Sequence, residues 1–261
     1  MPNQHAHPAD NSIATAKAAT QQCHSSPQVS CGDCRLSALC LPISLHIDDI
    51  DKLDRIVQRG KPLQKGDHLY RAGDDFHAVY AIRSGTVKAV HITDDGLEQV
   101  TGFYLPGEII GMDGIARNRY SNSAIALETA SVCEIPFARM EELSLKMPSL
   151  QRHFFQLMSK EITQDQQLIT LLSKNSAEER IAALLLSISS RNHQRGLSST
   201  HFRLPMSRAD IGNYLGLTVE TVSRVLSRFQ KQALICVDKR EISINDINKL
   251  RKISNAMSPY N

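Results

Sequence analysis

The chain has 261 residues, of which 41% are apolar and 22% are charged, as in a globular protein long enough for two domains. No apolar run approaches the roughly 20 residues that a membrane-spanning helix needs, and residues 1–22 lack the apolar segment of a secretory signal. The sequence therefore argues against a membrane or secreted protein and predicts a cytoplasmic one, in which the six cysteines stay reduced.

Charge is unevenly distributed along the chain. Residues 173–261 carry 14 Lys and Arg against 7 Asp and Glu, whereas residues 1–172 carry 16 against 20. A basic half is typical of a surface that binds phosphate groups, although many basic faces are only solvated. The C-terminal half is therefore where a nucleic-acid-binding motif is to be sought.

The N-terminal region combines a polar tail with a cysteine string. Residues 1–22 have no apolar periodicity and are expected to be disordered. In the cysteine-rich segment 23–45, Cys31, Cys34 and Cys40 form a C-x2-C-x5-C string, and Cys133 lies alone far downstream. Four thiolates suit either a zinc ion or an iron–sulfur cluster, and their spacing does not separate the two.

Residues 46–147 are predicted to form an antiparallel β-roll, or jelly roll, after one short helix. The helix is expected over 47–59, with Ile47, Ile50, Leu53 and Val57 on one face. From Gly60 to Pro136, short alternating runs are separated by turn residues, as in small antiparallel barrels. Asp94-Asp95-Gly96 is a typical hairpin turn.

A long helical stretch, 137–172, follows, and its part from 148 to 173 is predicted to be a dimerisation helix. Apolar residues recur there with spacings of four and three, as in a coiled coil. The seam consists of Met158, Ile162, Asp165, Ile169 and Leu172. In a parallel homodimer Asp165 would face its own copy, at a cost on the order of 1–4 kcal/mol. The alternative is that the seam packs only on its own roll.

Residues 174–252 are predicted to form a winged helix-turn-helix, with 253–261 as a tail. A helix over 176–192 and a loop over 191–200 precede a first motif helix, which begins at a Ser207–Asp210 capping box and ends at Gly216. Thr218 caps a second helix, Val219–Lys231, and Leu234–Ile244 forms the wing. The second helix is expected to bury Val222, Val225, Leu226 and Phe229. Its opposite face carries Glu220, Ser223, Arg224 and Arg228. Such side chains read base edges in the major groove, where Arg pairs with guanine.

This order of parts resembles the Crp–Fnr superfamily of bacterial transcription regulators, and within it the oxygen-sensing Fnr/Anr type. The likeness spans residues 31 to 244 and is most specific in Leu171–Arg180 and Asp210–Arg224. The resemblance implies an α+β fold with a cyclic-nucleotide-binding-like β-roll sensor. It also implies a regulator that is not an enzyme and that binds double-stranded DNA and RNA polymerase.

The resemblance further implies a switch. Cys31, Cys34, Cys40 and Cys133 would hold one oxygen-labile [4Fe–4S] cluster per subunit. The cluster-loaded form would be a homodimer bound to a palindrome with TTGAT-like half-sites, read by Glu220, Ser223 and Arg224. Oxygen would convert the cluster to a [2Fe–2S] form and release DNA. Asp165 would correspond to the carboxylate whose repulsion keeps the cluster-free form monomeric.

Several positions depart from the family pattern. Met112 and Asn122 stand where cyclic-nucleotide members need an acid and an arginine, so cAMP is not the expected effector. Arg35 is bulkier than the small residue expected after the second ligand. Cys23 and Cys236 fall outside the ligand motif.

Three alternatives remain open from the residues. The cysteines could hold structural zinc, or a small effector could bind in the roll. A metalloenzyme would need a set of two histidines and one carboxylate, and the roll contains His68, His77 and His91.

The resemblance also implies a contact with RNA polymerase, since the loop Thr93–Leu97 corresponds to a polymerase-contacting loop of the family.

Overall fold

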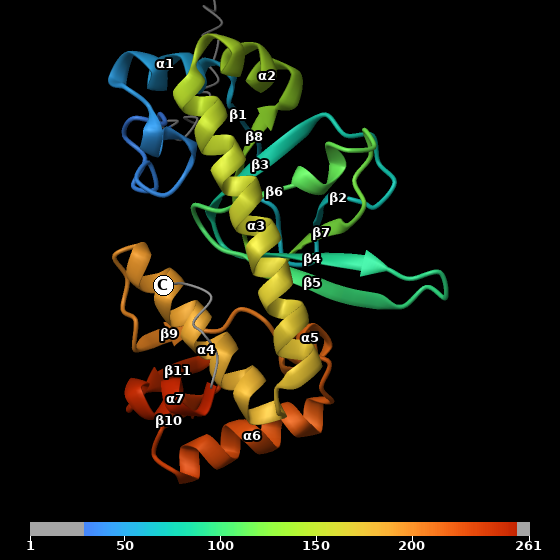
Figure 1. Cartoon of the computed structure of the whole chain (residues 1–261), viewed down its shortest axis with the longest axis vertical. Coiled ribbons are helices and arrows are strands. Elements are labelled where there is room, and N and C mark those ends of the chain that lie inside the picture. Colours follow the sequence, from blue (N-terminus) through green and yellow to red (C-terminus); the bar gives the residue numbers. More distant parts are fainter. Residues whose placement is uncertain (1–28, 255–261) are drawn as a thin grey trace, which may run out of the picture.

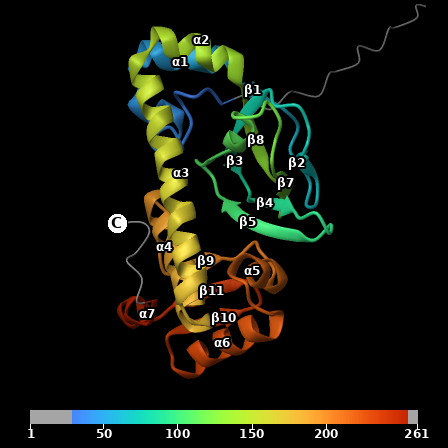
Figure 2. The same ribbon diagram turned by 45° about the vertical axis from the view of Figure 1, so that its right-hand side comes forward.

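The computed structural model describes residues 29–254 of the chain. A β-roll lies beside one long helix, α3, with the cysteine segment and two short helices at one end and a winged-helix domain at the other (Figures 1 and 2). The predicted tail 1–22, Cys23 and residues 255–261 lie outside the described residues. No helix within 29–254 has both the length and the apolar character to cross a membrane.

The first helix is shorter than predicted. The cysteine segment leads through a 3₁₀ turn, η1 (Leu41–Ser44), into α1 (Ile47–Ile56). The next residues form a two-residue strand, β1 (Gln58–Arg59), which pairs with Glu134 and Cys133. The prediction of helix up to residue 59 was wrong because backbone pairing with a distant strand overrides the local apolar period.

The predicted antiparallel β-roll is confirmed. Its two four-stranded sheets have the orders β1-β8-β3-β6 and β2-β7-β4-β5. The strands are β2 (His68–Tyr70), β3 (Ala78–Ser84), β4 (Val87–Ile92), β5 (Glu98–Tyr104), β6 (Ile109–Ile110), β7 (Ser123–Ala126) and β8 (Ser131–Pro136), with a 3₁₀ turn η2 (Met112–Gly114). The turn between β4 and β5 forms as predicted, with Gly96 at a φ of 81°, and this hairpin projects from the molecule (Figure 1).

The long helical stretch is divided into α2 (Phe137–Lys146) and α3 (Pro148–Lys174). The break falls at Met147 because proline disfavours a helical conformation in the residue before it but suits the first turn of a new helix. Leu150 and Phe154 of α3 pack with Leu41 and Leu53 into one buried cluster. The cysteine segment therefore rests on the N-terminal part of α3.

The winged-helix domain forms largely as predicted. Its elements are α4 (Ala177–Gln194), β9 (His201–Arg203), α5 (Arg208–Leu215), α6 (Val219–Lys231), β10 (Ile235–Asp238), β11 (Glu241–Ile244) and α7 (Ile247–Ser254). Both motif caps form, and Gly216 adopts a left-handed conformation. The loop predicted over 191–200 is partly wrong, because α4 continues to Gln194 and buries Arg191.

The roll and the winged helix share one apolar core. Val90, Val100 and Phe103 of the roll belong to the same buried cluster as the winged-helix residues. At the open edge of β5, the Asn213 side chain accepts from Val100 N (2.5 Å) and donates to Glu98 O (2.7 Å). An amide that pairs in this way imitates a neighbouring strand, so α5 is held in register with the roll.

Candidate cysteine site and DNA-binding surface

The four predicted ligands line one small cavity. Cys31, Cys34 and Cys40 come from the segment before η1, and Cys133 comes from β8. Together they border a cavity of about 40 Å³ between that segment and the sheet. Within the described residues, no three His, Cys, Asp or Glu side chains are placed to share a single metal ion. The fold thus gathers the cysteines without arranging them around one ion.

Burial in the cavity disfavours the thiolate form of the cysteines, and the nearby Arg59 charge offsets this only in part at Cys31. Burial, followed by the hydrogen bond and charge of Asp54, raises the pKa of Cys31 to about 12. Burial also raises the pKa of Cys40 to about 12 and that of Cys133 above its ordinary value. Iron or zinc binds thiolate, so a metal centre here must displace protons.

Two charged residues that sequence reasoning missed adjoin Cys31. The Asp54 carboxylate accepts from Cys31 N at 2.7 Å and from Arg59 Nη2 at 2.5 Å. Arg59 Nη2 also lies 3.5 Å from Cys31 Sγ. Nothing in the cysteine spacing pointed to this pair, since Arg59 is brought to the cavity by the β1–β8 pairing.

The other singled-out positions near the cysteines lie apart from the cavity. Arg35 is exposed and is not among the residues that line it. Cys236 is exposed on β10, and Cys23 lies outside the described residues. The bulk of Arg35 is therefore accommodated outside the cavity.

The cysteine segment contacts α3 directly. Leu41, the residue after Cys40, is 1% exposed and packs against α3 residues. His153 of α3 lies against the Cys40 backbone, and burial lowers the pKa of its imidazole. A change in the geometry of Cys40 must consequently be felt by α3.

The predicted seam is mostly exposed on the described chain. Ile162 and Ile169 are 57% and 67% exposed. Met158, by contrast, is half-buried against the apolar cluster that also contains Leu150 and Phe154. Phe155 was missed, although it precedes Ile162 by one heptad and is 59% exposed. Asp165 lies on the same helix, and partial burial raises its pKa.

Helix α6 has one buried and one exposed face, as predicted. Val222, Val225, Leu226 and Phe229 are buried. The candidate base-reading residues Glu220, Ser223, Arg224 and Arg228 are exposed. Arg228 forms an ion pair with Glu178 at the start of α4, while Arg224 bonds only weakly to Thr221 Oγ1, at 3.2 Å.

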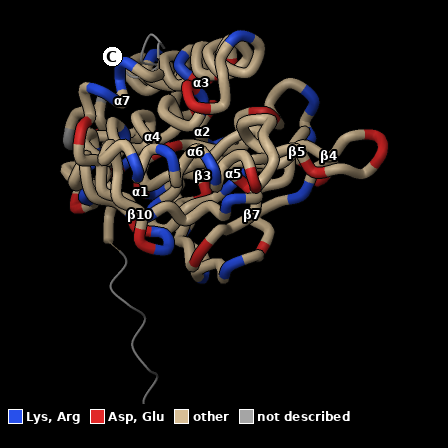
Figure 3. The backbone as a smooth tube through the Cα atoms, turned by 90° about the horizontal axis from the view of Figure 1, so that it is seen from below, with Lys and Arg blue, Asp and Glu red and all other residues tan. Residues whose placement is uncertain are grey.

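Basic positions gather at the winged-helix end. Seen from that end, Lys and Arg lie along α6 and near α4 and α7, while the projecting β4–β5 turn is acidic (Figure 3). In the wing turn, Lys239 adopts a positive φ of 54°, and Arg240 donates to Pro205 O at 2.9 Å. Of these two wing residues, Lys239 is therefore the one available to contact a phosphate group.

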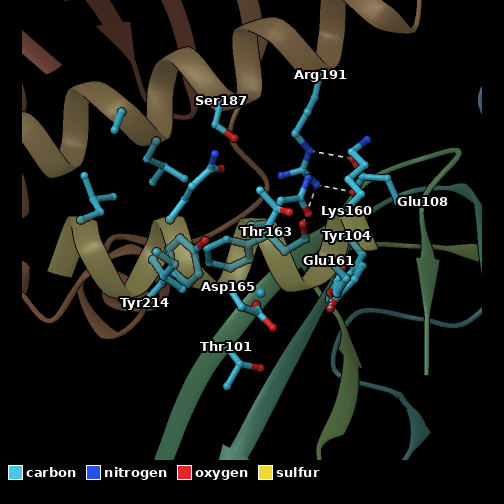
Figure 4. A pocket seen from close by; sticks show the side chains of 18 of the residues that line it. Thr101, Tyr104, Glu108, Lys160, Glu161, Thr163, Asp165, Ser187, Arg191 and Tyr214 are labelled. Carbon is cyan, nitrogen blue, oxygen red and sulfur yellow. Dashed lines mark hydrogen bonds and ion pairs between the residues drawn. The ribbon is translucent and has the colours of Figure 1, made fainter. Parts of the chain in front are cut away.

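A second cavity lies between the domains rather than inside the roll. It measures about 570 Å³ and is bordered by β5, α3, α4 and α5. On its wall, Tyr104 donates to Glu161 at 2.6 Å, and Arg191 forms an ion pair with Glu108 (Figure 4). Acidic and basic groups occur together along this wall, which favours no one charge class of ligand.

The roll interior is occupied by aromatic rings. Tyr70 and Tyr120 stack with their centroids 3.9 Å apart, and Tyr80 stacks on Tyr70 at 5.8 Å. Asn122 is held by Asp113, which accepts from its backbone and side-chain nitrogens. Asn122 is uncharged and is held by Asp113, so it cannot neutralise the charge of a cyclic phosphate.

Comparison with known proteins agrees with this architecture. A family model described as Crp-like helix-turn-helix domain matches residues 179–253, and one described as cyclic nucleotide-binding domain matches 61–146. The transcriptional activator protein Anr of Pseudomonas aeruginosa is 55% identical over 220 residues, covering 84% of this chain and 90% of the relative. The chain belongs to the Crp–Fnr family of transcription regulators. Another Crp–Fnr relative, the fumarate and nitrate reduction regulatory protein of Escherichia coli K12, is 50% identical over 226 residues, covering 87% and 90%.

A solved structure shows the same Crp–Fnr architecture. FixK2 from Bradyrhizobium japonicum superposes with a TM-score of 0.71 at 27% identity, covering 77% of this chain and 98% of FixK2. Because the relatives are named as regulators, the metalloenzyme alternative is wrong.

Proposed function

We propose that this Crp–Fnr protein is an oxygen-responsive transcriptional activator whose sensor is a [4Fe–4S] cluster, one per subunit. The observation that carries the proposal is the convergence of Cys31, Cys34, Cys40 and Cys133 on one cavity. The names of the relatives support it, since one is an activator and another regulates fumarate and nitrate reduction. When bound, the cluster supplies reactivity toward oxygen.

The residues present fit such a group. A cluster distributes four thiolates over four iron atoms, so the ligands need not approach one another as closely as around one ion. This suits a site where no three ligands are placed to share a single ion within the described chain. Arg59 Nε is buried there without a hydrogen-bond partner, which leaves a donor for sulfur. Neither the spread of the four cysteines nor the unpaired Arg59 Nε favours structural zinc.

The proposed signal passes from Cys40 to α3. Leu41 anchors the segment in the core that includes Leu150 and Phe154. Ordering of the cysteine segment then orients α3, whose exposed Phe155, Ile162 and Ile169 pair with a second copy. Without the cluster, repulsion between the two Asp165 carboxylates leaves the monomer.

The proposed output is binding to a palindrome with TTGAT-like half-sites. Glu220, Ser223 and Arg224 face outward on α6 and contact bases, while Arg228 contacts phosphate after leaving Glu178. A dimer binds two half-sites together, so loss of the dimer removes the second site's effective concentration. The protein acts in the cytoplasm, where its DNA lies.

We propose RNA polymerase as the second partner. The β4–β5 hairpin projects from the roll (Figure 1), and Ile92 and Leu97 beside its acidic turn are 47% and 65% exposed. Cyclic AMP is not part of the proposed mechanism, because Met112 and Asn122 replace the acid and the arginine, and the tyrosines fill the roll.

The first test is the visible absorption of anaerobically purified protein as air is admitted. A brown protein with an absorption band from thiolate-to-iron charge transfer that changes within minutes is the expected result. A protein that is colourless and contains zinc, or no metal, would overturn the proposed sensor while leaving the family assignment intact.

A further inference from the structure

Arg59 occupies a distinctive place at the cysteine cavity. On the neighbouring strand β8, Cys133 is its direct partner in the β1–β8 register. Its Nη2 lies 3.5 Å from Cys31 Sγ. One side chain thus adjoins two candidate ligands that are 102 residues apart in the chain (Cys31 and Cys133), one from the cysteine string and one from the sheet.

The guanidinium is held in place by a second contact and still has an unused donor. Asp54 binds Arg59 Nη2 at 2.5 Å and Cys31 N at 2.7 Å, which forms a three-membered network around the first ligand. The Arg59 side chain is only 10% exposed, and its Nε has no hydrogen-bond partner. A buried donor without an acceptor costs free energy unless something accepts from it.

A metal–thiolate centre would supply the missing acceptor for Arg59 Nε. Thiolate and sulfide sulfurs accept hydrogen bonds, and the charge of the four thiolates exceeds that of the iron core. Hydrogen bonds and positive charge beside such sulfurs raise the reduction potential and strengthen ligand binding. Arg59 is always protonated, so it provides this charge at any physiological pH.

We infer that Arg59 is a positioning residue of the sensor, which donates to cluster sulfur and fixes Cys31 through Asp54. The inference rests on the proposed function. It distinguishes Arg59 from Arg35, which adjoins a ligand in sequence but does not line the cavity. It also distinguishes Arg59 from Arg55, which is exposed on α1.

The test compares the full-length wild type with Arg59→Gln, Arg59→Lys and the control Arg55→Gln, all loaded with iron and sulfide without oxygen. The readouts are iron and sulfide per chain, the rate at which excess EDTA bleaches the visible band, and the midpoint reduction potential. We expect Arg59→Gln to lose its cluster to EDTA on the order of tenfold faster and to show a lower potential. Arg55→Gln should match the wild type.

Arg59→Lys separates positioning from folding. Lysine keeps the charge and the ion pair with Asp54 but lacks the planar fork that reaches two acceptors. This variant should unfold at the wild-type temperature without cluster, yet bleach faster than the wild type with it. If both Arg59 variants match the wild type in bleaching rate and potential, the inference about Arg59 fails while the proposed iron–sulfur sensor stands. If the wild type takes up no iron and sulfide, the inference and the proposed sensor fail together.

Discussion

Lys88 of β4 and Asp210 of α5 form an ion pair between the two domains, with Nζ and Oδ1 2.8 Å apart and side chains only 15% and 16% exposed. Asp210 has a second task, since it accepts from Ser207 N in the capping box of α5. Burial by itself would raise the pKa of Asp210, but the bonds from Lys88 and Ser207 outweigh it, and the pKa is lowered. The helix that begins the helix-turn-helix is therefore tied electrostatically to the β-roll.

Replacement of Lys88 should weaken this tie and alter the acid sensitivity of the protein. A carboxyl with a lowered folded pKa contributes stability above about pH 4, and the contribution is lost as pH falls through the folded pKa. Lys88→Met should lower the free energy of unfolding at pH 7 by about 1 to 3 kcal/mol. Between pH 7 and pH 3, the free energy of unfolding of this variant should fall less steeply than that of the wild type. Thermal unfolding between pH 3 and 7 measures both effects. Lys65→Met, which alters an exposed lysine, is the control, and an unchanged acid profile in Lys88→Met would contradict the argument.

Asp165→Ala should allow dimerisation in air. The substitution removes the like charges from the seam and leaves Ile162 and Ile169 exposed for pairing. Sedimentation of the cluster-free protein measures the oligomeric state, with the neighbouring exposed Gln166→Ala as control. A monomeric Asp165→Ala protein would show that this carboxylate is not what separates the subunits.

Cys133→Ala should abolish cluster uptake, whereas Cys236→Ala should not affect it. Cys133 lines the cavity, and Cys236 is exposed on the wing. Iron and sulfide content after anaerobic loading measures uptake, and circular dichroism checks that the helices remain. Cluster-loaded Cys133→Ala protein would remove this residue from the ligand set.

Arg224→Ala should reduce affinity for the palindromic site by about 1 to 3 kcal/mol and reduce discrimination against a scrambled duplex. Arg228→Ala should weaken both duplexes about equally and by less, because Arg228 must first leave Glu178. Fluorescence anisotropy at fixed salt measures these affinities. Arg139→Ala, on α2 at the other end of the molecule, is the control. Equal losses from Arg224→Ala on both duplexes would assign that residue to phosphate.

Gly212→Ala should destabilise the helix-turn-helix. A Cβ at this position would lie 2.6 Å from the backbone oxygen of Leu217, which cannot rotate away. We expect a loss of about 1 to 3 kcal/mol in stability, seen as a lower unfolding temperature. Gly60→Ala, where nothing lies within 4 Å of the new Cβ, should have little effect. If the two variants unfold at the same temperature, the backbone around Gly212 and Leu217 can move apart to accept a methyl group.

Local chemistry let the sequence alone determine the winged helix. Ser207 with Asp210, Gly216 and Thr218 form caps and a turn whose partners lie within a few residues, and the apolar stripe of α6 follows from helical periodicity. Cys31, Cys34 and Cys40 likewise stand out by their close spacing, whereas Cys133 became a candidate ligand through the resemblance to the Crp–Fnr family.

Only the tertiary structure decided which distant groups meet. The residues at 58 and 59 were assigned to a helix, yet they pair with β8 and bring Arg59 to Cys31 and Cys133. Arg191, expected in a loop, is buried against Glu108 of the roll, and Gly212 is required by a carbonyl five residues later. Strand pairing, ion pairs between domains and close backbone approach depend on where remote segments lie in space, and no local spacing encodes them.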